Sequence, residues 1–229
     1  MLFDIDGTLI DSAGVGLLSL REGFFDAFEE TRSRPDDFPR LDLGGCTDHS
    51  VAIEIFRAFG IGDTDTNRNR FYEAYSVRLS ENLSASRPRN ARLLSGAREL
   101  LEKIQTTTDH TLSLLTGNVE NGAMIKTGHF GIDHYFSFGA FGNDHHDRNQ
   151  LGPIAIERAR EKTGREFTGN DVIVIGDTPR DIACARACGA SVIAVATGTA
   201  CRETLAQCEP DELFDDLSDT DKLLSALKK

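Results

Sequence analysis

Long hydrophobic runs are missing from this chain of 229 residues. No stretch approaches the roughly 20 apolar residues that a helix needs to cross a bilayer, which excludes a membrane-spanning helical protein. The first residues also lack a basic segment followed by an apolar one, the pattern of a secretion signal. We therefore expect a soluble protein of the cytoplasm.

Cysteine and basic residues are also scarce. The five cysteines contain no set with the spacing of zinc ligands, so we expect buried packing thiols in a reducing compartment. With 37 acidic against 25 basic residues, the net charge is −12, and this field repels nucleic acids and anionic membranes. A small anionic partner is still compatible with this charge, because a bound metal and a few local donors reverse the field inside a pocket. We expect a monomer or a homodimer.

Residues 13–89 lack any convincing strand, whereas the rest of the chain alternates strands with helices. Strands are expected at 1–5, 112–116, 135–138, 171–176, 191–196 and 213–214, with helices at 97–105, 119–130, 151–163, 179–188 and a last one carrying Leu223, Leu224 and Leu227. This alternation is typical of an α/β fold, a Rossmann-like parallel sheet with helices on both faces.

The strand-free segment contains three helix-like stretches, at 17–30, 47–59 and 69–83. Small and polar residues flank it at 12–14 and 86–90, as expected of hinges. We therefore predict a core formed by residues 1–12 and 90–229, with residues 13–89 inserted as a helical unit.

The most informative segment is Met1-Leu2-Phe3-Asp4-Ile5-Asp6-Gly7-Thr8-Leu9. Because side chains alternate faces along a strand, Asp4 and Asp6 leave the strand end on the same side. Two crowded carboxylates repel each other, and a divalent cation with oxygen ligands would hold them together. One carboxylate could then attack an electrophile.

Three further segments follow predicted strand ends or precede helices, where parallel sheets place their sites. Thr116-Gly117-Asn118 closes one strand and opens a helix, so a hydroxyl and helix-start N–H groups could hold an anion. Arg148 precedes the next helix. Asp177 and Asp181 lie on either side of the junction between the 171–176 strand and the helix that follows it.

These four segments, in this order, closely resemble the motifs of the haloacid dehalogenase-like hydrolase superfamily, and in particular its phosphatases with a helical cap after the first strand. The resemblance covers essentially the whole chain. It implies a mobile cap formed by residues 13–89, a small phosphorylated metabolite as substrate and Mg²⁺ as cofactor.

Carried over by motif, the resemblance makes Asp4 the nucleophile that forms an aspartyl-phosphate, and Asp6 the acid and then the base. Thr116 would bind the phosphoryl group. Gly7, Gly117 and Asn118 would shape that phosphate site, and Arg148 would supply the cation of the third motif.

The same resemblance implies that Mg²⁺ binds the Asp4 carboxylate, the Asp6 backbone carbonyl and Asp177, with Asp181 supporting them through water. We expect Asp4 to stay ionised beside the cation, and the crowding by other carboxylates to raise the pKa of Asp6.

The third motif departs from the family, which usually has Lys followed by Pro, whereas this chain has Asp147-Arg148-Asn149-Gln150. Arg158, inside the following helix, is the competing candidate. We favour Arg148 because helix-start residues face the strand ends.

Among related activities, a dehalogenase lacks the second aspartate, and a phosphonoacetaldehyde hydrolase needs a cap lysine that residues 13–89 do not contain. A β-phosphoglucomutase-like phosphomutase and a non-catalytic binding relative are the alternatives to a phosphoglycolate phosphatase-like monoesterase. The glycine-containing stretch 43–49, which ends in His49, is expected to face the substrate, with Thr47 or Asp48 capping the next helix.

Overall fold

The computed structural model describes residues 1–85 and 90–226, and within them six strands form one parallel sheet. The strand order is β5-β4-β1-β6-β7-β8, so the first strand of the chain lies in the middle. The strands are β1 (Leu2–Phe3), β4 (Ser113–Leu115), β5 (Gly139–Ala140), β6 (Ile173–Gly176), β7 (Ser191–Val195) and β8 (Glu212–Phe214). The expected Rossmann-like α/β fold is confirmed.

Helices cover both faces of this sheet because successive strand residues point to opposite sides. Phe3 and Ile175 belong to a core cluster with helices α4 and α9, whereas Leu2 and Val174 belong to a second cluster with α6, α7 and α8. The bounds of these helices are α4 (Ala97–Thr107), α6 (Leu151–Thr163), α7 (Pro179–Ala187), α8 (Arg202–Gln207) and α9 (Thr220–Ala226).

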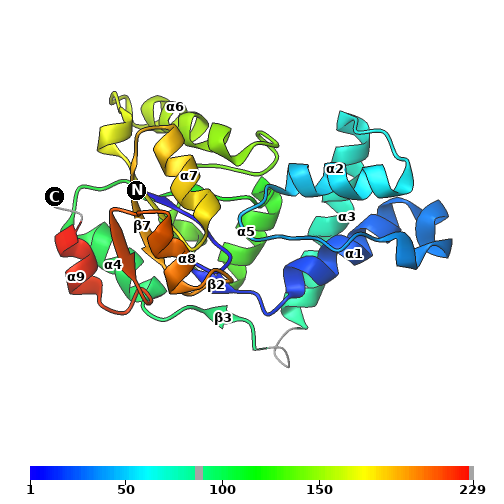
Figure 1. Ribbon diagram of the computed structural model, residues 1–229, viewed down its shortest axis with the longest axis horizontal. Helices are drawn as coiled ribbons and strands as arrows, with labels where there is room; N and C mark the ends of the chain where they lie inside the picture. The colour runs from blue at the N-terminus through cyan, green and yellow to red at the C-terminus, as the bar shows by residue number, and fades with distance from the viewer. Residues whose placement is uncertain (86–89, 227–229) are drawn as a thin grey trace.

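Three long helices lie to one side of the sheet, at the right of Figure 1. They are α1 (Val15–Ala27), α2 (Asp48–Phe59) and α3 (Asp65–Ser84), and their apolar faces form a third core cluster rich in phenylalanine. Thr47 caps α2, as expected, by accepting a hydrogen bond from the Ser50 N–H. The helices expected within residues 13–89 are therefore present, and they share an apolar cluster.

Helix α5 (Glu120–His129) links the two groups of helices. Ala123 of this helix packs in the core cluster that contains Phe3 and Ile175. Val119, the residue before the helix begins, packs with α1, α2 and α3. One side of α5 therefore belongs to the sheet core and the other meets α3 (Figure 1).

Two features of the fold differ from the sequence prediction. A strand at 135–138 is wrong: a 3-10 helix occupies Asp133–Tyr135, and β5 begins only at Gly139. A short antiparallel pair, β2 (Ile10–Asp11) with β3 (Arg92–Leu93), joins the segments that precede and follow the insertion, and the sequence analysis missed it. Both strands have only two residues, too few to show a period.

Several predicted details lie at the limits of the described chain. The first expected hinge contains Ala13 and Gly14, both with positive φ. Most of the second, residues 86–89, and Leu227 of the last helix lie outside the described residues. Of the five cysteines only Cys184 is buried and Cys201 is exposed, so the expectation of uniformly buried thiols is wrong.

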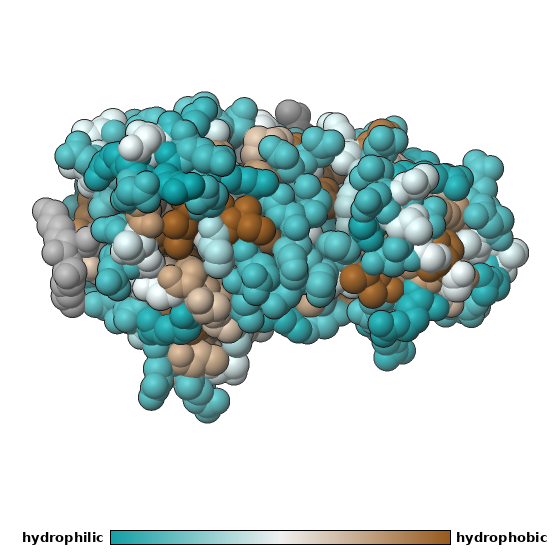
Figure 2. All heavy atoms as spheres, turned by 90° about the horizontal axis from the view of Figure 1, so that it is seen from above, coloured by the Kyte–Doolittle hydropathy of each residue, from teal (hydrophilic) through white to brown (hydrophobic). Residues whose placement is uncertain are grey.

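The surface is largely hydrophilic on the face that Figure 2 shows. Apolar side chains are scattered among the hydrophilic residues there. No helix in the described part of the chain is both long and apolar enough to cross a membrane.

Candidate active site

The candidate site lies at the carboxyl ends of three adjacent strands. Asp4 follows β1, Thr116 follows β4 and Asp177 follows β6, and β1 pairs with both of the other strands in parallel. Because parallel strands end at the same edge of the sheet, residues that are far apart in sequence meet there.

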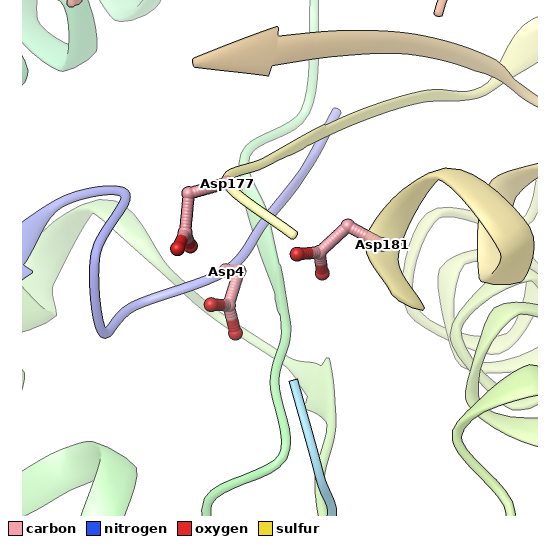
Figure 3. Close-up of side chains that lie close together, drawn as sticks. All are labelled: Asp4, Asp177 and Asp181. Atoms are coloured by element: carbon pink, nitrogen blue, oxygen red, sulfur yellow. The ribbon is translucent and has the colours of Figure 1, made fainter. Parts of the chain in front are cut away.

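Three carboxylates converge at this edge. One ligand oxygen each from Asp4, Asp177 and Asp181 lies within 4.8 Å of the others, and all three residues are buried. Figure 3 shows the three side chains close together, with those of Asp177 and Asp181 directed toward Asp4. The Thr8 hydroxyl donates a hydrogen bond of 2.9 Å to Oδ1 of Asp177.

Gly7 permits the tight turn beside this cluster. Its φ of +82° is in the left-handed region, and a Cβ atom there would lie 2.4 Å from Oδ2 of Asp177. The structure therefore places Gly7 directly against the acidic cluster.

Arg148 is the cation of this cluster. Its Nη2 lies 3.1 Å from Oδ1 of Asp4 and also donates to Oδ1 of Asp181, and the side chain is buried. Arg158 instead pairs with Asp144 and donates to the carbonyl of Gly139. Of the two candidates, only Arg148 contacts the acidic cluster.

The acidic cluster carries more negative charge than Arg148 balances. Burial raises the pKa of Asp4 to about 6; Arg148 opposes this rise, and the Asp181 and Asp6 carboxylates add to it. Burial, followed by the charges of Asp181 and Asp4, also raises the pKa of Asp177 well above its ordinary value. A cation among these oxygens would relieve both effects.

The expectation of a raised pKa for Asp6 is wrong. Burial, the largest single effect, raises this pKa, but the ammonium of Lys126 and the hydrogen bonds from Lys126 and Asn118 together outweigh burial, so that the pKa of Asp6 is lowered. Nζ of Lys126 lies 2.5 Å from Oδ2 of Asp6. The carboxylate of Asp6 therefore pairs with this lysine and is not part of the acidic cluster of Asp4, Asp177 and Asp181.

Asn118 connects Asp6 to Thr116 through hydrogen bonds. The Asn118 amide donates hydrogen bonds of 2.8 Å to Oδ2 of Asp6 and to the Thr116 hydroxyl. Asn118 faces the cavity, but the fully buried Thr116 is not among the residues that line it. The phosphate-binding role of Thr116 stays a prediction.

The start of α5 already binds a carboxyl group, which comes from α2. The Val119 N–H donates to Oδ2 of Asp48 at 2.8 Å, and the Glu120 N–H donates to Oδ1 of Asn143. The Asp48 N–H in turn donates to the Gly117 carbonyl at 2.7 Å. The helix-start donors that we expected for phosphate are therefore taken by side chains.

A cavity of about 390 Å³ opens between this edge of the sheet and the inserted helices. The core contributes Asp4, Asp6, Lys126, Arg148 and Asp177, and the insertion contributes Leu17, Leu20, Leu43, Gly44, Gly45, Cys46, Asp48, Val51 and Tyr75. The 43–48 stretch thus faces the cavity as expected, whereas His49 does not line it. A larger hollow of about 720 Å³ lies at the other end of the strands, away from the acidic cluster.

Sequence reasoning missed Lys126 and gave Asp48 only the role of a helix cap. A signal for Lys126 was available, since it lies eight residues, about two helical turns, after Asn118 and therefore points from the predicted helix toward the side where Asn118 precedes it. The contact of Asp48 with Val119 joins residues 71 positions apart, and no local pattern reveals it.

Comparison with known proteins agrees with this geometry. A family model described as haloacid dehalogenase-like hydrolase matches residues 1–195. The chain belongs to this family. A phosphoglycolate phosphatase of Haemophilus influenzae is 25% identical to this hydrolase over 223 residues, which cover 94% of this chain and 93% of that protein.

Solved structures share the fold of the hydrolase. A hydrolase from Pseudomonas syringae superposes with a TM-score of 0.70 at 21% identity, covering 98% of this chain and 96% of that chain. A protein described as a predicted phosphoglycolate phosphatase from Haemophilus somnus has a TM-score of 0.67 at 23% identity, covering 97% and 96%.

Proposed function

We propose that this hydrolase is a Mg²⁺-dependent phosphomonoesterase of small phosphorylated metabolites, similar to phosphoglycolate phosphatase, and that it acts through an aspartyl-phosphate on Asp4. The observation that carries the proposal is the buried cluster of Asp4, Asp177 and Asp181 beside Arg148. The phosphoglycolate phosphatase relatives support the substrate class.

The residues present fit a magnesium ion. Three buried carboxylates with one arginine among them leave negative charge uncompensated, and hard oxygen ligands are those that Mg²⁺ prefers. Asp4, Asp177 and the Asp6 backbone carbonyl would hold the ion. Both oxygens of Asp181 already accept hydrogen bonds, one from Arg148 and the other from Thr178, so Asp181 would support the ion through water.

Bound Mg²⁺ would neutralise charge on the phosphoryl oxygens. An oxygen of Asp4 attacks phosphorus, and the bond from phosphorus to the leaving oxygen breaks. In the minor fraction of the enzyme in which Asp6 carries a proton, that proton moves to the leaving oxygen. Water then attacks the aspartyl-phosphate and gives its proton to Asp6, and phosphate leaves Asp4. Arg148 holds the Asp4 carboxylate in place throughout.

We also propose that residues 13–89 act as a cap on a core formed by residues 1–12 and 90–229. The separate apolar cluster of α1, α2 and α3 supports this division. The 43–48 stretch of the cap would close the cavity over the leaving group and exclude water.

The direct test is hydrolysis of p-nitrophenyl phosphate and phosphoglycolate by the purified protein. We expect phosphate release that EDTA abolishes and Mg²⁺ restores, and a loss of at least about a thousandfold in kcat for Asp4→Asn. Retained metal-dependent turnover in Asp4→Asn would overturn the mechanism. Transfer of phosphate within the substrate without release would indicate a mutase instead.

A further inference from the structure

We propose that Lys126 is the positioning residue of Asp6: together with Asn118 it binds one oxygen of the Asp6 carboxyl group and keeps that group directed at the leaving oxygen of the substrate. This inference rests on the proposed function, because it concerns the acid step of that reaction. It assigns a role to a side chain outside the four motifs of the sequence.

The first observation is the burial of the lysine. The Lys126 side chain is 4% exposed, and a buried ammonium is costly unless it is paired and hydrogen-bonded. Its position on α5 faces the cavity, where an apolar side chain of the same length would avoid that cost. We infer that the positive charge of Lys126 serves the site that it faces.

The second observation is how the contacts of Lys126 are arranged. Nζ donates to Oδ2 of Asp6 at 2.5 Å and to Oδ1 of Asn118 at 2.6 Å, while Nδ2 of Asn118 donates to the same Oδ2 at 2.8 Å. The three side chains form a closed triangle, in which two donors bind one carboxylate oxygen. Such a triangle fixes the rotation of the carboxyl group.

The third observation is the exposure of Asp6. Its side chain is 37% exposed, and it lines the same cavity as Asp4 and Lys126. One oxygen is thus held from behind, whereas part of the group is open to a ligand. A proton donor to the leaving oxygen needs this combination of fixed position and access.

Leaving-group dependence of kcat/KM separates this role from a merely structural one. With phosphoglycolate the leaving alkoxide requires a proton, whereas p-nitrophenolate leaves without one. Both substrates share the later hydrolysis of the aspartyl-phosphate, which does not enter kcat/KM once the leaving group has gone. For Lys126→Met we expect kcat/KM to fall about 100-fold with phosphoglycolate and less than about threefold with p-nitrophenyl phosphate.

A double-mutant cycle and a matched control complete the experiment. Lys126→Met should add almost nothing to the loss caused by Asp6→Asn, because the two side chains act as one unit. Lys162→Met, an exposed lysine on α6, should leave both substrates unchanged. If Lys126→Met does not fold, Asn118→Ala removes the second donor to the same oxygen and should still lower the phosphoglycolate rate more than the p-nitrophenyl phosphate rate.

Equal losses with the two substrates, or no loss with either, would overturn the role of Lys126 and leave the phosphatase assignment standing. Absence of phosphate release by the wild-type protein with both substrates would instead overturn the proposed function itself.

Discussion

Two buried cations divide the negative charge of the site between them. Arg148 contacts Asp4 and Asp181, and Lys126 contacts Asp6. The two aspartates of the first motif therefore lie in different electrostatic environments although only one residue separates them. Different environments allow one carboxylate to act as nucleophile while the other transfers protons.

Arg148 should be far more important than Arg158. Arg148→Met removes the one cation that contacts the Asp4 cluster in the described chain, so we expect kcat/KM to fall about 100-fold or more. The free energy of unfolding in EDTA should also fall, by about 3–5 kcal/mol, because buried carboxylates lose their partner.

Arg158→Met is the matched control, since its side chain pairs with Asp144 away from the cluster. We expect its kcat/KM to stay within about tenfold of the wild type, and urea unfolding with steady-state kinetics measures both variants. A larger loss for Arg158→Met than for Arg148→Met would reverse the assignment of the third-motif cation.

At the scale of elements, α2 and the start of α5 meet through one carboxyl group, that of Asp48. Burial raises the pKa of Asp48 to about 6; the Lys126 charge and the Val119 N–H oppose this rise. The folded state thus holds a proton on Asp48 that the unfolded chain, with a pKa near 3.8, has already released. Stability from this group is present at low pH and is lost as the pH rises from about 4 to above 6.

Asp48→Asn should remove this pH dependence, because its amide oxygen can still accept the Val119 N–H. We expect the free energy of unfolding of the variant, minus that of the wild type, to increase by up to about 3 kcal/mol between pH 4 and pH 7. Urea unfolding in EDTA at several pH values measures the difference. A constant difference, or one that decreases with pH, would contradict the raised pKa of Asp48.

The loop before α5 also depends on close packing. A Cβ atom on Gly117 would lie 1.9 Å from the Cys46 carbonyl oxygen, so the 43–48 stretch would have to move away from the core. We expect Gly117→Ala to fold but to lose at least about tenfold in kcat/KM, since small misplacements at a site are costly.

Gly62→Ala is the control for this change, because its nearest neighbour would be a Thr64 methyl carbon at 3.9 Å. Near-wild-type kinetics for Gly62→Ala and a clear loss for Gly117→Ala would show that turnover needs the close packing of the 43–48 stretch against Gly117. Wild-type kinetics in both variants would show that the contact between Gly117 and Cys46 is not needed for turnover.

At the scale of the whole molecule, the sequence predicted what local patterns encode. The β-branched run of β6 and the proline and glycine limits of α6 and α7 predicted those elements closely. The Asp4 motif predicted the acidic cluster, because parallel strands bring their ends together. Short elements such as β2, β3 and β5 were missed or misplaced, since two residues show no period.

Contacts between residues far apart in the sequence determine the site features that the sequence analysis missed. Lys126 is 120 residues from Asp6, and its ammonium reverses the expected pKa shift of that carboxyl group. The Asp48 carboxylate takes the helix-start donor that the sequence suggested for phosphate. Neither contact follows from local spacing, because each depends on how α5 packs between the sheet and the inserted helices.

The most direct measurement of the central claim is the covalent state of Asp4 during turnover. The hydrolase is mixed with Mg²⁺ and phosphoglycolate, quenched in acid within a turnover, digested and examined by mass spectrometry. The account predicts a peptide carrying one phosphoryl group on Asp4, sensitive to hydroxylamine and missing in Asp4→Asn. Phosphate release by the wild type with an unmodified Asp4 at every quench time, or a phosphoryl group on another residue, would contradict it.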